Sequence, residues 1–260
     1  MNTFFQVDAF ANRPFSGNTA AVIISESALS PDFMQKLATQ NNLPATAFVR
    51  PVNSGYGLRW FTPKHELSLC GHATLASAYI LFELGMAKIE NKIHFTTGKG
   101  DLWAGWDGGW ITIDFPAYGC EPIEIPDDLK ACFNNQFKAG FKTLDKYVIE
   151  LTDESAVRNY VPDFSKLAPY KCVVTARGGE GSDYDFISRY FSVPDGVYED
   201  AVTGSSHCGL APFWAERLGK NKLKAYQASS RGGELKLVVD GQRVLISGQA
   251  NCVVEGKLMI

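Results

Sequence analysis

No apolar run in this 260-residue sequence approaches the roughly 20 residues that a helix needs to span a bilayer. Positive charge is not in excess either, because 25 Lys and Arg stand against 28 Asp and Glu. Nucleic acids and anionic membranes are therefore poor candidates as partners, since both bind clustered positive charge. The first residues lack the basic region of a secretory signal, so we expect a cytoplasmic protein.

The common metal and nucleotide motifs are missing as well. The six cysteines include no C-x-x-C pair, and His65-Glu66 is not followed by the second histidine of H-E-x-x-H. Residues 98–100 are too short for a dinucleotide fingerprint, and residues 204–209 miss the G-x-S-x-G pattern of serine hydrolases. We therefore expect no metal and no cofactor.

The chain repeats itself once. At a shift of 133 positions, Gly71 falls on Gly204, and the Asp-Gly pair at 107–108 falls on the pair at 240–241. One coincident Asp-Gly pair means little, because it is a common hairpin turn. Several coincidences at a single shift, within the same order of elements, indicate a duplication.

Each copy contains one segment that is apolar nearly all round. These segments are residues 71–84 and 204–218, and each is followed by a glycine that can stop a helix. A helix without a polar face must be enclosed, and the neighbouring segments can supply the strands. We predict an α+β fold with two pseudo-twofold-related domains, residues 1–116 and 117–260, each a sheet or barrel around a central buried helix. A Ser-Pro start predicts a further helix over residues 31–40.

The starts of the two central helices are candidate binding sites. Residues 71–74 and 203–207 combine glycine with small polar residues, and a helix N-terminus offers free N–H groups and partial positive charge. Two such ends facing each other would hold a carboxylate and stabilise an enolate-like charge. Residues 17–18 are a third candidate contact. A single Gly-Ser start more often only caps its helix, so the expectation of a site depends on the duplication.

Four segments of the chain resemble the signatures of one known family. They are residues 7–18, 61–76, 199–208 and 227–233. Their motifs are similar to those of the phenazine biosynthesis PhzF-like proteins, and together they cover nearly the whole chain. The resemblance implies the diaminopimelate-epimerase-like fold, which agrees with the duplication. It also implies a homodimer and a cofactor-independent isomerase, since the best-understood member isomerises a dihydro-hydroxyanthranilate by moving a proton.

The resemblance also assigns site residues, position by position. His72 and Asp200 correspond to residues that relay or orient the proton, and Ser205 to one that hydrogen-bonds the substrate. The helix starts and the segment at 17–18 supply the expected substrate contacts, which are Gly17, Asn18, Gly71, Ala73, Gly204 and Ser206. The plain structural alternatives are a helix cap for Asp200 and a satisfied core histidine for His72.

The chain departs from the family at one position that matters for catalysis. The family pattern Asn-Leu-(Ser or Pro)-Glu-Thr-Ala-Phe carries the glutamate that shuttles the proton, and here Ala45 stands in its place. Alanine cannot exchange a proton, and losing a positioned acid or base typically costs about 10²–10⁴ in rate. Natural divergence and an introduced substitution both fit the sequence. Neither Asp8 nor Glu66 stands at a motif position from which it would replace the glutamate.

Cys70 offers a second chemistry. In related epimerases and proline racemases, two cysteines that precede the paired helices act as bases on opposite faces of a carbon. Cys70 stands at the first place and Thr203 at the second, which resembles the hydroxyproline dehydratases of that superfamily more than a two-base racemase. A helix N-terminus favours a thiolate. A small packed residue is an equally good interpretation of Cys70.

We predict a cofactor-independent isomerase that moves a proton on a small cyclic or amino-acid-like carboxylate, with its activity in doubt because of Ala45. One alternative is an epimerase or dehydratase that uses Cys70. The other is a non-catalytic protein that binds a ligand or a partner on this fold.

Overall fold

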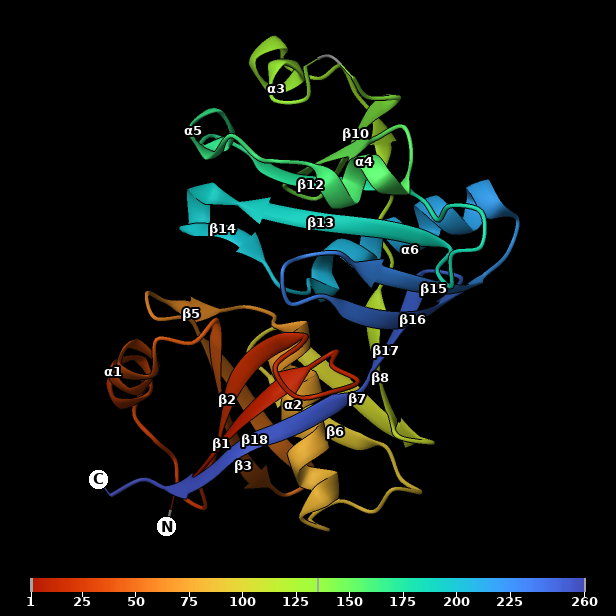
Figure 1. Cartoon of the computed structure of the whole chain (residues 1–260). Helices are drawn as coiled ribbons and strands as arrows, with labels where there is room; N and C mark the ends of the chain where they lie inside the picture. The colour runs from red at the N-terminus through yellow and green to blue at the C-terminus, as the bar shows by residue number, and fades with distance from the viewer. Residues whose placement is uncertain (1, 135, 260) are drawn as a thin grey trace. The chain divides into compact units, whose positions relative to one another are not determined.

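The two apolar helices expected from the sequence begin at the expected glycines. In the computed structural model, which describes residues 2–134 and 136–259, α2 spans Gly71–Glu83 and α6 spans Gly204–Leu218 (Figure 1). Nine of the 13 residues of α2 and nine of the 15 residues of α6 are buried, so each helix needs an enclosing sheet. No helix in the described ranges is both long and apolar enough to cross a membrane.

The chain divides into two units. Unit 1 comprises Met1–Asp114 with Ser247–Ile260, and unit 2 comprises Phe115–Ile246. The end of the chain belongs to unit 1 because β18 (Ala250–Lys257) pairs antiparallel along β1 (Thr3–Ala9). The predicted domains, residues 1–116 and 117–260, were drawn from the repeat in the sequence. That boundary between the two copies stays a prediction.

Unit 1 surrounds α2 with strands. Besides β1 and β18 these are β2 (Asn18–Ile24), β3 (Ala45–Val52), β4 (Gly55–Phe61), β5 (Glu66–Leu67), β6 (Ile93–Thr97), β7 (Gly100–Asp107) and β8 (Trp110–Pro116), whose last two residues belong to unit 2. They pair in the order β18-β1-β2-β3-β4-β6-β7-β8, with β5 on the edge of β4. The pairs β2–β3 and β4–β6 are parallel, and each is joined by a crossover that contains a helix.

Unit 2 repeats this scheme around α6. Its strands are β9 (Glu121–Pro122), β10 (Ala139–Thr143), β11 (Lys146–Glu150), β12 (Lys171–Arg177), β13 (Phe186–Ser192), β14 (Val197–Asp200), β15 (Lys222–Gln227), β16 (Gly233–Asp240) and β17 (Arg243–Gly248). Its shorter helices are α3 (Asp127–Ala131), α4 (Glu154–Asn159), α5 (Phe164–Leu167) and the 3₁₀ turn η1 (Val193–Asp195).

The pairings of unit 2 match those of unit 1 strand for strand. β9 pairs with β10 as β18 pairs with β1, while β11–β12 and β13–β15 are the parallel pairs. The starts of β16 and β17 lie 133 positions after those of β7 and β8, which is also the offset between α2 and α6. The observed elements therefore repeat at the offset found in the sequence, and the predicted α+β fold with a central helix in each half is confirmed.

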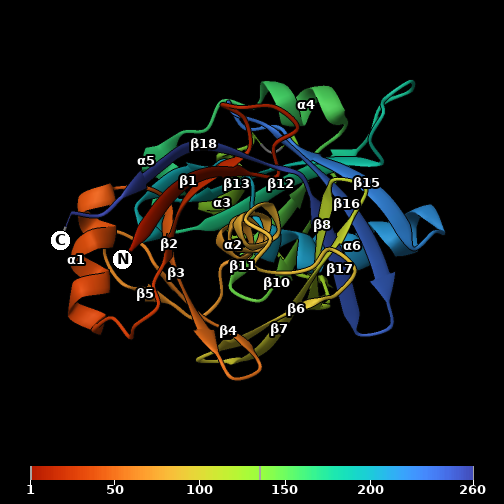
Figure 2. The same ribbon diagram turned by 90° about the horizontal axis from the view of Figure 1, so that it is seen from below.

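Two helices cover the two faces of β1, β2 and β3 in unit 1. On one face, Ile23 and Phe48 pack against Met34 and Leu37 of α1 (Pro31–Asn41). Side chains alternate along a strand, so Ala45 belongs to the opposite face, which α2 covers. Figure 2 looks along α2 and shows the strands around it, with α1 outside them.

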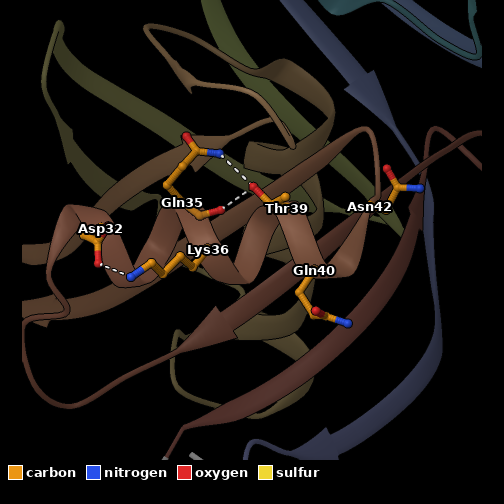
Figure 3. Close-up of a pocket in the computed structure, with 6 residues that line it drawn as sticks. All are labelled: Asp32, Gln35, Lys36, Thr39, Gln40 and Asn42. Atoms are coloured by element: carbon orange, nitrogen blue, oxygen red, sulfur yellow. Dashed lines mark hydrogen bonds and ion pairs between the residues drawn. The ribbon is translucent and has the colours of Figure 1, made fainter.

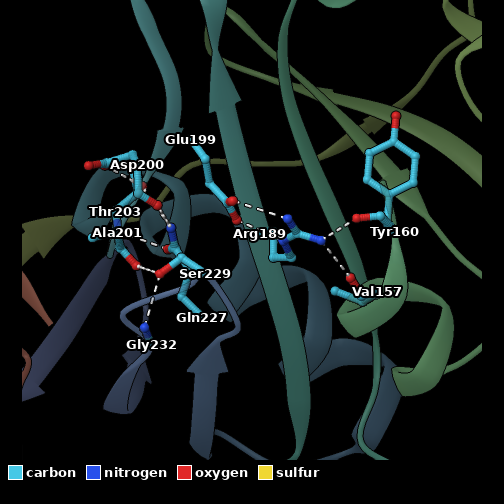
Figure 4. A network of polar contacts seen from close by, with 10 residues as sticks. All are labelled: Val157, Tyr160, Arg189, Glu199, Asp200, Ala201, Thr203, Gln227, Ser229 and Gly232. Carbon is cyan, nitrogen blue, oxygen red and sulfur yellow. Dashed lines mark hydrogen bonds and ion pairs between the residues drawn. The ribbon is translucent and has the colours of Figure 1, made fainter. Parts of the chain in front are cut away.

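An arginine–glutamate pair is repeated in the two units. In unit 1, Arg59 on β4 donates two hydrogen bonds to Glu66 on β5, at 2.7 and 2.8 Å. In unit 2, Arg189 on β13 donates two to Glu199 on β14, at 2.7 and 3.0 Å (Figure 4). Each pair fixes the short strand that leads into the central helix, and the bidentate geometry makes both specific.

The two pairs differ in burial. The side chains of Arg59 and Glu66 are 36% and 42% exposed, whereas those of Arg189 and Glu199 are 10% and 19% exposed. Arg189 also donates to the carbonyl oxygens of Val157 and Tyr160 at the end of α4, at 3.3 and 2.6 Å (Figure 4). The pair in unit 2 is therefore part of the interior, while that in unit 1 is close to solvent.

We expect Glu199→Gln to destabilise the protein far more than Glu66→Gln. Removing one partner of a buried pair leaves an uncompensated charge and costs about 3 kcal/mol, whereas an exposed pair contributes at most about 1 kcal/mol. The shift in the urea midpoint of unfolding measures both effects. Equal shifts for the two variants would show that the difference in burial does not change how much each pair contributes to stability.

Candidate active site

The start of β3 and the start of α2 lie at the same end of the sheet of unit 1. Ala45 is the first residue of β3 and is fully buried beside Ala20 of β2. Thr46 pairs with Phe61, and Phe61 pairs with the first residue of β5, from which the chain soon enters α2 at Gly71. Ala45 thus lies on the face that α2 covers, at the end where α2 begins.

Asp8 belongs to the other face of the same strands. Asp8 on β1 pairs with Thr19 on β2. The next residue of β2, Ala20, pairs with Ala45 on β3. Because side chains alternate, Asp8 and Ala45 point to opposite sides of the sheet. The Asp8 carboxylate accepts hydrogen bonds from Thr19 Oγ1 at 2.6 Å and from the Phe15 N–H at 2.8 Å. Its geometry supports the expectation that Asp8 does not take the place of the family glutamate.

Cys70 and His72 meet at the N-terminus of α2. Cys70 is the N-cap residue, is 6% exposed, and makes no side-chain capping bond. Its Sγ atom lies 3.5 Å from Nδ1 of His72. Burial disfavours the imidazolium form and lowers the pKa of His72 to about 4. His72 is therefore neutral near pH 7 and able to accept a proton.

The other predicted contacts of unit 1 are main-chain groups or buried side chains. Ala73 is fully buried and its side chain has no polar atom, so its N–H is the only donor it has for a ligand. Gly17 has φ of 65°, and a Cβ there would lie 2.2 Å from the Ala9 oxygen, so this position requires glycine. Asn18 is fully buried at the start of β2. All three lie at the sheet end described above, together with Gly71.

In unit 2 a buried glutamine fixes the start of α6. Gln227 donates from Nε2 to the Asp200 carbonyl oxygen at 2.7 Å, and its Oε1 accepts from the Thr203 N–H at 2.8 Å. Thr203 in turn donates its hydroxyl to the Asp200 carboxylate at 2.5 Å (Figure 4). Asp200 and the N-cap of α6 are thus held together, as expected if Asp200 caps the following turn.

Sequence reasoning did not single out Gln227. It lies within the motif at 227–233, but its partners are 24 and 27 residues away. In the same motif, Ser229 donates to the Ala201 carbonyl at 2.7 Å and accepts from the Gly232 N–H at 3.1 Å (Figure 4). This motif therefore supports the segment that leads from Asp200 into α6.

The polar residues in the first turn of α6 differ in exposure. Ser205 is partly exposed, whereas Ser206 is 1% exposed and its Oγ has no hydrogen-bond partner among the described residues. His207 is fully buried, with Nδ1 donating to the Thr203 carbonyl at 2.8 Å and Nε2 3.4 Å from Ser188 Oγ. Burial lowers the pKa of His207 to about 4. His207 is a core histidine with both nitrogens in contact with polar groups, a role that its sequence position did not reveal.

Two other features of the described chain were candidates for a site, a hollow beside α1 and any cluster of metal-binding side chains. A hollow along the exposed side of α1, shown in Figure 3, is lined by residues that bond to one another, such as Asp32 with Lys36 at 2.9 Å. We assign no function to it. Across residues 2–134 and 136–259, no three His, Cys, Asp or Glu side chains gather as a metal site would require. The expectation of a reaction without metal or cofactor stays a prediction.

The architecture of paired units, each built around a central helix, also occurs in a known epimerase. A crystal structure of a hydroxyproline epimerase from Agrobacterium vitis superposes with a TM-score of 0.62 and 11% identity, over 98% of this chain and 91% of that one. At this level of identity the likeness concerns the fold alone. Together with closer structures it confirms the predicted diaminopimelate-epimerase-like fold.

Relatives of higher identity define the family. The family model of the phenazine biosynthesis-like proteins matches residues 7–256. Uncharacterized isomerases of Pseudomonas aeruginosa and Halalkalibacterium halodurans are each 42% identical, with 98% of both chains covered. A crystal structure of a PhzF-family phenazine biosynthesis protein from Enterococcus faecalis is 38% identical, with a TM-score of 0.94 over 100% of this chain and 99% of that one. The chain belongs to the phenazine biosynthesis-like (PhzF) family, among its isomerases.

The buried His207 predicts a dependence of stability on pH. Its pKa falls from an ordinary value of 6.5 to about 4, so between these values the unfolded chain binds a proton that the folded chain does not. The free energy of unfolding therefore falls as the pH drops from 6.5 towards 4, by up to about 3 kcal/mol from this group. We expect the stability difference between the natural chain and His207→Gln to shrink over that range in urea titrations. A difference that stays constant from pH 7 to pH 4 would refute this assignment.

Proposed function

We propose that this protein is an isomerase that moves a proton on a small cyclic or amino-acid-like carboxylate. The observation that carries the proposal is the position of Ala45, which faces α2 at the end of the sheet where α2 begins. A glutamate at this position would direct its carboxylate toward the N-terminus of α2. Isomerisation then needs no oxidant or reductant, because the same group takes a proton from one carbon and returns it to another.

The residues of both units have roles in this proposal. The free N–H groups at the start of α2, including those of Gly71 and Ala73, hold the substrate carboxylate. His72 relays or orients the proton as a neutral imidazole, since its lowered pKa leaves it uncharged near pH 7. In unit 2, taken by itself, Asp200 is oriented by Thr203 at the start of α6, and the partly exposed Ser205 has a hydroxyl able to donate a hydrogen bond to a ligand there.

The remaining predicted contacts act mainly through their backbone or immediate surroundings. In this proposal Gly17 and Gly204 allow close approach of the main chain, while Asn18 and Ser206 supply buried polar groups next to these glycines. With Ala45 in place of the family glutamate, the chain as it stands lacks the main proton shuttle. We infer that it turns its substrate over slowly.

Ala45→Glu is expected to raise the rate of proton exchange by about 10² or more, because it supplies a positioned acid and base. The measurement is deuterium incorporation from solvent into a panel of cyclic amino and hydroxy acids. Ala45→Gln is the matched control, since glutamine has nearly the same size but cannot exchange a proton at neutral pH. A rate that is unchanged in Ala45→Glu, or raised equally in Ala45→Gln, would contradict the glutamate mechanism.

A second candidate function uses Cys70, and the contact with His72 favours it. Sγ of Cys70 lies 3.5 Å from Nδ1 of His72, so the neutral imidazole can hydrogen-bond and orient the thiol. With a pKa of about 4, His72 is too weak a base to hold the thiol proton, so the thiolate has to be favoured by the N-terminus of α2. A thiolate at the N-terminus of α2 would act as a base in an epimerase or dehydratase. Thr203, at the corresponding place before α6, gives its hydroxyl to Asp200 and is therefore not a free second base.

Cys70→Ser separates the two candidates. If the natural chain exchanges protons through the thiol, this variant should lose that exchange by about 10² or more, while His72→Gln should lower it less. Exchange by the natural chain that survives Cys70→Ser would exclude the cysteine as the base. Binding of a small acid by the natural chain and by Ala45→Glu, with exchange in neither, would instead favour a non-catalytic binding protein.

We also propose, from the family resemblance, that the protein forms a homodimer. Sedimentation equilibrium at micromolar concentration distinguishes the monomer of 28.5 kDa from a dimer of twice that mass.

A further inference from the structure

One buried donor in the sheet of unit 1 has no acceptor. Trp60 lies on β4 and is 2% exposed, and its indole Nε1–H has no hydrogen-bond partner among the described residues. A buried donor without a partner gives up its hydrogen bond to water and receives nothing in return, so such groups are rare in folded proteins. Phenylalanine would place a buried ring here without that cost. The tryptophan therefore calls for an explanation other than packing.

Trp60 shares the face on which Ala45 lies. The next residue, Phe61, packs in the cluster beneath α1, and side chains alternate along a strand, so Trp60 points to the face that α2 covers. Trp60 pairs with Ala47 on β3, and Ala45 is two residues from Ala47 on the same face. Trp60 and Ala45 are thus diagonal cross-strand neighbours. Cβ atoms placed in this way are about 7 Å apart, within reach of an aromatic ring and a long side chain.

The other cross-strand neighbours of Trp60 on this face have no use for its N–H. Ala47 lies directly opposite on β3, Val49 is the second diagonal neighbour, and Leu67 lies opposite on β5. None of these side chains has an acceptor atom. Position 45 is the one neighbour at which the proposed mechanism requires a carboxylate, and a carboxylate there would have an acceptor oxygen for the indole.

We propose that Trp60 is a positioning residue, whose indole N–H donates a hydrogen bond to a carboxylate at position 45 and so orients it for proton transfer. This inference rests on the function proposed above and adds the group that holds the acid–base side chain. A hydrogen bond from a buried N–H stabilises a carboxylate in its charged form, which is the form that accepts a proton. The natural chain folds with Ala45, so this hydrogen bond serves the reaction and not the fold. The chain retains the donor and lacks the acceptor.

The indole ¹⁵N–¹H resonance of Trp60 reports this hydrogen bond directly and needs no substrate. Of the five tryptophan resonances, it is the one absent from the spectrum of Trp60→Phe. In Ala45→Glu, near pH 8, we expect it to move downfield in the proton dimension by more than any of the other four. In Ala45→Gln the shift should be smaller, because a neutral amide oxygen is a weaker acceptor. Ala45→Gln also serves as the test variant if Ala45→Glu does not fold.

A double-mutant cycle measures the strength of the interaction. Trp60→Phe is made in the natural chain and in Ala45→Glu, and urea unfolding gives the equilibrium constant of each protein. The smaller ring costs stability in both backgrounds, so the difference between them isolates the hydrogen bond. We expect Trp60→Phe to raise the unfolding constant about tenfold more in Ala45→Glu than in the natural chain. Phe61→Leu is the matched control, because Phe61 is equally buried on the other face and should act alike in both backgrounds.

The pH dependence of exchange separates positioning from packing. Loss of the donor should raise the pKa of the introduced carboxylate, because its charged form is then less stabilised. Deuterium exchange by Ala45→Glu should therefore reach half its maximum at a pH about one unit higher when Trp60→Phe is added. Adding Phe61→Leu instead should leave this midpoint unchanged.

The outcomes distinguish this inference from the function on which it rests. If Ala45→Glu exchanges protons but neither the Trp60 resonance nor the cycle responds, the role of Trp60 is refuted and the proposed function stands. If Phe61→Leu couples to position 45 as strongly as Trp60→Phe, the coupling reflects a general loosening of the sheet, and the hydrogen bond is refuted. If the resonance and the cycle respond but Ala45→Glu exchanges no protons, the hydrogen bond exists. The proposed isomerase function then fails, and the positioning role fails with it.

Discussion

The structure depends on enclosing a helix that has almost no polar face. α2 exposes so little polar surface that strands must cover it on all sides, and in unit 1 β1 to β3 are then covered on their outer face by α1. The sides of such a helix are closed to a substrate, so the free polar groups available to one are those at its ends. The proposed site lies at the N-terminus of α2, where the first N–H groups have no partner within the helix, and the same reasoning applies to α6.

Both units hold the strand before the central helix with an arginine–glutamate pair, but the pair is buried to different degrees in the two units. Each must hold the short strand before its central helix, and each does so with a bidentate arginine–glutamate pair. In unit 2, Arg189 also binds two carbonyl groups at the end of α4, which draws the pair into the interior. A polar network that is fully satisfied in this way fixes geometry more firmly than an exposed pair. Asp200 directly follows Glu199, so this network also sets the position of a proposed site residue.

The sequence predicted those features whose causes are local or repeated. The helices at residues 71, 204 and 31 begin at glycine or at a Ser-Pro cap, and these signals act within a few residues. The same sequence did not reveal Gln227 or the buried state of His207, because their partners are brought close only by the fold. The sequence therefore predicts where each helix starts. The positions of the side chains around that start are known only from the structure.

The fold places no polar requirement on position 45, although the proposed mechanism depends on the residue at that position. Ala45 lies beside Ala20 on a face packed against a helix, where a small apolar side chain fits without a polar partner. A glutamate there would bury a charge that folding does not need, and active sites commonly sacrifice stability in this way. Replacing it with alanine removes that cost and leaves the enclosed helix, the ion pairs and the glutamine bridge unaltered. Close similarity to the family's structures is thus fully compatible with loss of its proton shuttle, because the likeness reflects the enclosure of the helices and not the chemistry at their ends.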